Sequence, residues 1–141
     1  MEIQKNNSYS KVEFLLQLDD IIKYIIEGKI KRGKCFGIHL FCTSYHRNVE
    51  IIQPADKNGI WQALLETRHP KTNTWVKKEK SSTMFPKIWD EKMLKIKLIE
   101  AFENKKKKTS YKYIGFTHCK VPIVFIFQKG IISSVYPLIE K

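Results

Sequence analysis

The sequence predicts an α+β fold with mainly antiparallel sheets. Two segments have helical periodicity, one near the N terminus and one in the middle, and consecutive groups of strand-like segments follow each of them. An alternating strand-helix order, which would predict a parallel sheet, does not occur. The 141 residues, 43% of them apolar, have the size of one ordinary domain. No repeat or linker divides the chain, so we expect residues 1–141 to form a single domain.

The first helix is predicted over residues 10–28. Ser10 and Glu13 have the spacing of a capping box, and Gly28 supplies a stop signal. Apolar residues between them recur at helical intervals: Leu15, Leu18, Ile22 and Ile25.

Four strands are predicted after this helix. The basic residues 29–34 are expected to form a turn, and two hairpins are expected to follow it. The first hairpin joins residues 35–43 to 49–53, and the second joins 61–67 to 74–80.

The second helix is predicted to begin after Asp90, which can cap it, and to end near Asn104. The lysine run at 105–108 is expected to form a solvated loop. Three further strands are then predicted, at residues 112–117, 123–128 and 131–136.

The net charge of +12 at pH 7 indicates an anionic partner, which is a nucleic acid, an acidic protein or a membrane surface. The first helix carries Glu13, Asp19 and Asp20 on its polar side, which argues against the membrane. No apolar run is long enough to span a bilayer and no secretion leader is recognisable, so we expect a soluble protein. Three cysteines without metal-binding spacing indicate neither a disulfide framework nor a zinc site.

Four histidines are the residues whose ordinary pKa is near neutrality: His39, His46, His69 and His118. Each of them taken singly is compatible with a structural imidazole. His39 lies in a predicted strand, and His46 lies in the hairpin connection that follows, from which it can fold back toward His39. Two imidazoles beside a lysine are the groups that metal-free RNA cleavage requires. The acidic residues are dispersed, so we expect no metal or other cofactor.

Five short blocks in the second part of the chain resemble motifs of one known family, the bacterial EndoU-type endoribonuclease toxins. They occur in family order: GIH at 37–39, NGIWQA at 58–63, WVKK at 75–78, KEKSSTMFPKIW at 78–89 and SVYP at 134–137. The resemblance covers residues 37–137, whereas residues 1–36, the N-terminal helical part, match no motif of the family.

The resemblance implies an EndoU-like fold of two sheets with a central helix, and cleavage of RNA by its own 2′-hydroxyl to a 2′,3′-cyclic phosphate and a 5′-hydroxyl. It makes His39 a catalytic histidine and Lys78 the catalytic lysine, with Lys80 as the alternative. Ser82 or Thr83 would contact the base and ribose of the cleaved nucleotide. Tyr136 would do so too.

The family pattern places a second catalytic histidine upstream of Gly-x-His, and residues 1–36 contain no histidine. His46 is the nearest candidate for that role, and His118 is the next. The opposing class of function is a non-catalytic module, either a basic RNA-binding domain or a degenerate relative that kept only the fold.

The resemblance also implies partners and a place of action. The RNA substrate would be tRNA, and a dedicated acidic immunity protein would hold the enzyme inactive. The chain would be delivered or secreted as part of a larger toxin and would act as a monomer in the cytoplasm of a recipient cell.

Overall fold

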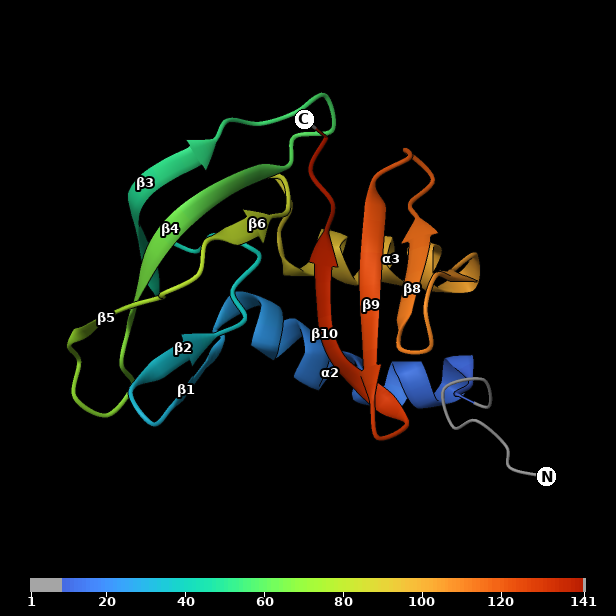
Figure 1. Ribbon diagram of the computed structural model, residues 1–141, viewed down its shortest axis with the longest axis horizontal. Helices are drawn as coiled ribbons and strands as arrows, with labels where there is room; N and C mark the ends of the chain where they lie inside the picture. The colour runs from blue at the N-terminus through green and yellow to red at the C-terminus, as the bar shows by residue number, and fades with distance from the viewer. Residues whose placement is uncertain (1–8, 141) are drawn as a thin grey trace.

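The computed structural model describes residues 9–140 and confirms the α+β fold class. Two four-stranded antiparallel sheets lie beside each other (Figure 1). Helix α2 (Lys11–Ile26) runs from behind the C-terminal sheet toward the N-terminal one, and α3 (Glu91–Glu103) lies behind the C-terminal sheet. No helix within the described residues is long and apolar enough to cross a membrane.

Both helices begin where the sequence predicts. The Ser10 side chain accepts a hydrogen bond from Glu13 N, and the Glu13 carboxylate accepts one from Ser10 N, which completes the capping box. The Asp90 carboxylate accepts a bond from Met93 N, 2.8 Å away, at the start of α3. The buried face of α2 packs into the larger core and consists of Phe14, Leu18, Ile21, Ile22 and Ile25.

The C-terminal sheet has the strand order β10-β9-β8-β7. Its strands are β7 (Lys106–Lys107), β8 (Lys112–Phe116), β9 (Pro122–Gln128) and β10 (Ile131–Pro137). Three of them confirm the predicted strands. The loop prediction for the lysine run was wrong at β7, because strand pairing uses main-chain groups and leaves the lysine side chains in water.

The N-terminal sheet is built around β4 (Trp61–Arg68), which pairs with three strands. They are β3 (His46–Gln53), β5 (Trp75–Lys77) and β6 (Ser82–Met84). Alternate residues of β4 are buried over a second, smaller core that includes Trp61, Ala63 and Leu65. The predicted pairing of residues 61–67 with 74–80 is confirmed in outline, although β5 ends at Lys77.

The predictions for residues 29–43 were wrong. The expected basic turn contains β1 (Lys29–Lys31), which pairs with β2 (Lys34–Phe36), and the expected strand 35–43 ends at Phe36. The backbone takes positive φ at Gly37 (+81°) and Ile38 (+65°), a conformation that a strand cannot contain. The expected hairpin between 35–43 and 49–53 therefore does not form, and β3 pairs with β4.

Candidate active site

The segment after β2 crosses the C-terminal end of α2. Ile38 N donates a hydrogen bond to Tyr24 O (3.3 Å), and His39 N and Leu40 N both donate to Ile25 O, at 2.7 and 3.3 Å. These carbonyls belong to the last turn of α2, and Tyr24 O also accepts a hydrogen bond from Gly28 N at 3.0 Å. The end of the helix therefore fixes the backbone on which the His39 side chain is mounted.

Strand β6 holds the same segment from the other side. Phe85 N donates to His39 O at 2.6 Å, and the buried Ser82 hydroxyl donates to Gly37 O at 3.4 Å. Strand β6 also lies against β10 of the other sheet, at the centre of Figure 1. We call this place, where residues 37–40, β6, β10 and the end of α2 meet, the seam.

The His39 imidazole has a defined tautomer. Its Nδ1 lies 2.7 Å from Thr83 O, and because a carbonyl oxygen only accepts, Nδ1 carries the hydrogen. Burial lowers the pKa of His39 from 6.5 to about 4, the Thr83 hydrogen bond opposes this, and the positive charge of Lys78 adds to it. At neutral pH the ring is uncharged, and its Nε2 is the atom that can accept a proton.

Lys78 brings a buried cation to the seam. Its side chain is only 8% exposed, its backbone N donates to Leu65 O, and its Nζ donates to Lys80 O at 3.0 Å. Burial lowers the pKa of Lys78, and its charge is felt by both Cys35 and His39. Lys80, the alternative catalytic lysine, has an exposed side chain and uses its carbonyl to position Lys78.

The remaining predicted substrate contacts lie on β6 and β10. Tyr136 is half-buried, and its ring centroid lies 5.7 Å from that of His39. Thr83 is half-buried and supplies the carbonyl that holds His39. Ser82 is 1% exposed with its hydroxyl turned to Gly37 O, so in this structure it positions the seam and has no access to a substrate.

The structure does not bring His118 to the seam, and it buries His46 beside the backbone of Ile26, at the end of α2. His46 is 2% exposed, and its Nδ1 accepts a hydrogen bond from Cys42 N at 3.0 Å. His118 lies in the exposed loop after β8, where its Nδ1 is 3.3 Å from Glu100 Oε2. These surroundings are those of structural and surface imidazoles, and the catalytic role expected for His46 stays a prediction.

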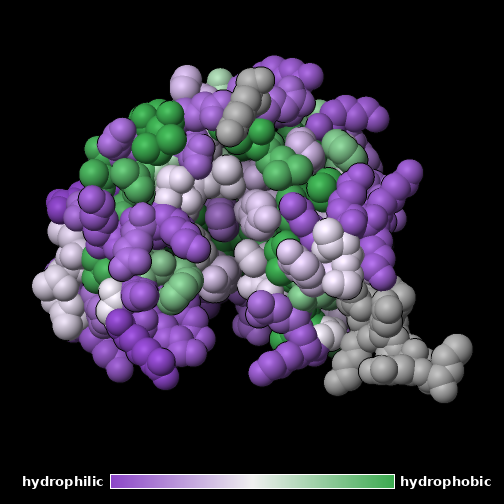
Figure 2. Space-filling model, in the orientation of Figure 1, coloured by the Kyte–Doolittle hydropathy of each residue, from purple (hydrophilic) through white to green (hydrophobic). Residues whose placement is uncertain are grey.

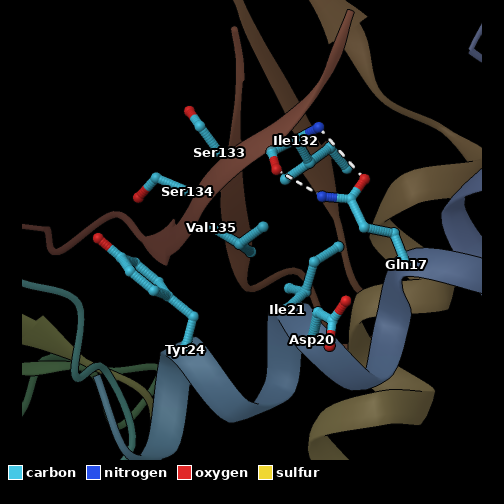
Figure 3. A pocket seen from close by; sticks show the side chains of 8 residues that line it. All are labelled: Gln17, Asp20, Ile21, Tyr24, Ile132, Ser133, Ser134 and Val135. Carbon is cyan, nitrogen blue, oxygen red and sulfur yellow. Dashed lines mark hydrogen bonds between the residues drawn. The ribbon is translucent and has the colours of Figure 1, made fainter. Parts of the chain in front are cut away.

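Two residues at the seam were missed by sequence reasoning. Tyr24 and residues 132–135 line opposite sides of a pocket of about 160 Å³ between α2 and β10 (Figure 3). Cys35 is buried, and its thiol interacts electrostatically with both Tyr24 and Lys78. In the sequence, Tyr24 looks like a core residue of the first helix and Cys35 like a small residue of a strand. Neither therefore indicated a place in the active site.

A polar hollow is visible on the face of the molecule shown in Figure 2. Figure 2 shows a hollow at the lower edge, between the two halves of the molecule, with mainly hydrophilic residues on both sides. Within the described residues, no group of three His, Cys, Asp or Glu side chains that could hold a metal ion occurs. The site offers an imidazole that accepts a proton and an ammonium that stabilises negative charge.

A neutral imidazole and a buried ammonium whose charge reaches it, on a strongly basic α+β protein, are groups that a metal-free nuclease can use. Comparison with family models bears this out: the model described as "Bacterial EndoU nuclease" matches residues 18–139. The chain belongs to the bacterial EndoU nuclease family, as the sequence blocks indicated, and such a domain implies endoribonuclease activity. No curated protein and no solved structure gave a match to the chain.

Proposed function

We propose that the protein is a metal-independent endoribonuclease that uses the 2′-hydroxyl of its RNA substrate to cleave the adjacent phosphodiester. The products are a 2′,3′-cyclic phosphate and a 5′-hydroxyl. The observation that carries this proposal is the pairing at the seam of His39, whose Nε2 is free of a proton at neutral pH, with the Lys78 cation.

Each group has a defined task in this reaction. Nε2 of His39 removes the proton from the 2′-hydroxyl as its oxygen attacks phosphorus, and Lys78 stabilises the charge that builds on the phosphoryl oxygens. The Tyr136 ring offers a stacking face for a base beside His39, and the Thr83 hydroxyl can contact the ribose or base.

A ribonuclease assay in EDTA tests the proposal directly. We expect cleavage of RNA without a divalent ion, and fragments that cannot be ligated until their cyclic phosphate is opened. A substrate with one 2′-deoxynucleotide at the cut site is the matched control, and it should resist cleavage there. A non-catalytic RNA-binding module, the competing function, would retard both substrates and cut neither.

For the biological role, we propose a delivered bacterial toxin that acts on tRNA in the cytoplasm of a recipient cell, as a monomer. An acidic immunity protein would neutralise it, since the net charge of +12 favours an acidic inhibitor. Expression without the inhibitor should stop growth and cut tRNA, and co-expression should restore growth. Normal growth at measurable expression, with RNA cleavage intact in vitro, would remove the toxin role and keep the ribonuclease.

A further inference from the structure

The proposed reaction needs two proton transfers, and the seam holds one accessible histidine. One group must take the proton of the 2′-hydroxyl, and another must give a proton to the 5′-oxygen as it leaves. Resting on the proposed function, we propose that Tyr24 is the second group: its phenol protonates the leaving 5′-oxygen while His39 acts as the base.

The Tyr24 ring lies against the backbone that carries His39. A Cβ atom placed on Gly37 would fall 2.9 Å from Cε1 and 3.1 Å from Cδ1 of this ring. The carbonyl of Tyr24 accepts the bond from Ile38 N. The Tyr24 side chain is therefore held at one end of the seam, against Gly37, which is two residues before His39 in the chain.

Strand β10 connects the positions of the two groups. Figure 3 shows the hydroxyls of Tyr24 and Ser134 turned to the same side of the pocket between α2 and β10. Ser134 and Tyr136 are two residues apart on β10, so their side chains lie on the same face of the strand. Tyr136 lies against the His39 ring, so this face of β10 leads from the pocket beside Tyr24, at Ser134, to His39, at Tyr136.

The protonation states suit this division of roles. Burial raises the pKa of Tyr24, and the neighbouring Cys35 raises it further, so the phenol keeps its proton at neutral pH. The same physical cause leaves His39 unprotonated. Two groups whose surroundings push their pKa values apart are the pattern expected of an acid and a base in one site.

Tyr136 is the competing donor, and its position argues for a different task. Its ring lies against that of His39. In the reaction, however, the attacking oxygen approaches phosphorus from the side opposite to the leaving oxygen. An acid must therefore stand apart from the base. The Tyr24 ring instead packs against the backbone of Gly37 and lines the pocket together with Ser134.

The step balances without another reactant. The 2′-oxygen forms its bond to phosphorus and its proton passes to Nε2 of His39, while the bond from phosphorus to the 5′-oxygen breaks and that oxygen takes the phenolic proton. The products are the cyclic phosphate and the 5′-hydroxyl, and solvent exchange returns the phenolate and the imidazolium to their starting forms.

The experiment compares two substrates in the full chain. One is an RNA oligonucleotide, and the other carries a bridging sulfur in place of the 5′-oxygen, so that its thiolate leaves without a proton. Tyr24→Phe should lower cleavage of the first by about 10²-fold or more and leave cleavage of the second within about threefold of the unaltered protein. Tyr45→Phe, at an exposed tyrosine in the turn before β3, is the matched control and should change neither rate.

Each alternative outcome has one meaning. Equal losses on both substrates would make Tyr24 a positioning residue, and unchanged cleavage of RNA would remove it from the reaction; either overturns the proposal. If Tyr136→Phe lowers cleavage of the RNA but not of the sulfur substrate, the acid is Tyr136 instead. An unaltered protein that cuts neither substrate would overturn the proposed function itself. Circular dichroism of each variant checks that it is folded.

Discussion

At the scale of single residues, desolvation is the largest cause of the pKa shift in both proposed proton-transfer groups. Removing water from an imidazole favours its neutral form, which is a base, and removing water from a phenol also favours its neutral form, which is an acid. His39 and Tyr24 are shifted in this way at the same seam. No carboxylate partner is needed to set the two protonation states.

The acid side of the pH profile should reveal His39. Since its pKa is lowered to about 4, kcat/KM should fall on acidification only as the pH approaches about 4, and not near the ordinary value of 6.5. Steady-state cleavage of a short RNA between pH 3.5 and 8, on protein shown by circular dichroism to be folded at each pH, measures this. A fall in kcat/KM centred near pH 6.5 would contradict the role of His39 as a base with a lowered pKa.

Lys78 and Lys80 form a matched pair for testing the cation. Lys78→Met keeps the length of the buried stem and removes the charge, so cleavage should drop by about 10²-fold or more with little change in folding. Lys80→Met removes an exposed charge and keeps the carbonyl that holds Lys78, so cleavage should change by less than about fivefold. Similar losses in the two variants would show that the rate follows general surface charge instead of one buried ammonium.

At the scale of elements, the break after β2 is what creates the site. Positive φ at two consecutive residues turns the chain away from the strand path and across the end of α2. A β-branched residue with φ of +65°, as at Ile38, is strained and persists only where its surroundings enforce it. Here the hydrogen bonds to α2 and β6 do so.

Gly37 and Gly33 offer a controlled test of this break. Both have positive φ, but a Cβ at Gly37 would lie 2.6 Å from Tyr24 O, whereas at Gly33 nothing lies within 4 Å. Gly33→Ala should cost only the conformational strain, about 1 kcal/mol of unfolding free energy. Gly37→Ala should cost at least about 2 kcal/mol more and should lower cleavage further, by moving His39. Urea unfolding and RNA cleavage of both variants provide the comparison. Equal effects would mean that the close contact at Gly37 affects neither stability nor cleavage.

Local signals explain which elements could be predicted. The caps at Ser10 and Asp90 and the strands β8, β9 and β10 are encoded within a few neighbouring residues, and they occur as expected. The end of β2 could not be foreseen, because residues 37–40 follow a pattern suited to a strand. Their conformation is decided by carbonyls of α2 and by β6, which lie far away along the sequence.

At the scale of the whole molecule, acid should destabilise the fold through His46. Burial lowers its pKa from 6.5 to about 4, so between these values the unfolded chain binds a proton that the folded chain does not. Stability should therefore be complete above about pH 6.5 and fall by roughly 3 kcal/mol as the pH drops to about 4.

The variant that tests this is His46→Asn, whose side-chain oxygen can still accept the bond from Cys42 N but does not titrate. Urea unfolding at pH 7 and pH 4.5 should show a smaller difference for the variant than for the unaltered protein. If the unfolding free energy differs between the two pH values by the same amount in the variant, a group other than His46 causes the acid sensitivity. Retained cleavage at pH 7 would also count against His46 as a catalytic group.

The assembly of the site explains how far sequence reasoning reached. His39, Lys78 and Tyr136 stand in motif blocks and could be named in advance, and the fold gathers them at the seam. Tyr24 belongs to no block, and its place follows from how α2 lies against β10. His46 is the nearest histidine to His39 along the chain, and its catalytic role stays a prediction.

The position of β10 at the seam also bears on when the enzyme can act. β10 lies C-terminal to every other part of the site, and it brings Tyr136 to His39 and closes the pocket over Tyr24. A ribosome makes the chain from its N terminus, so a nascent chain has its base and its cation before the strand that completes their surroundings. The proposed cleavage of RNA would therefore begin only when β10 has emerged and docked.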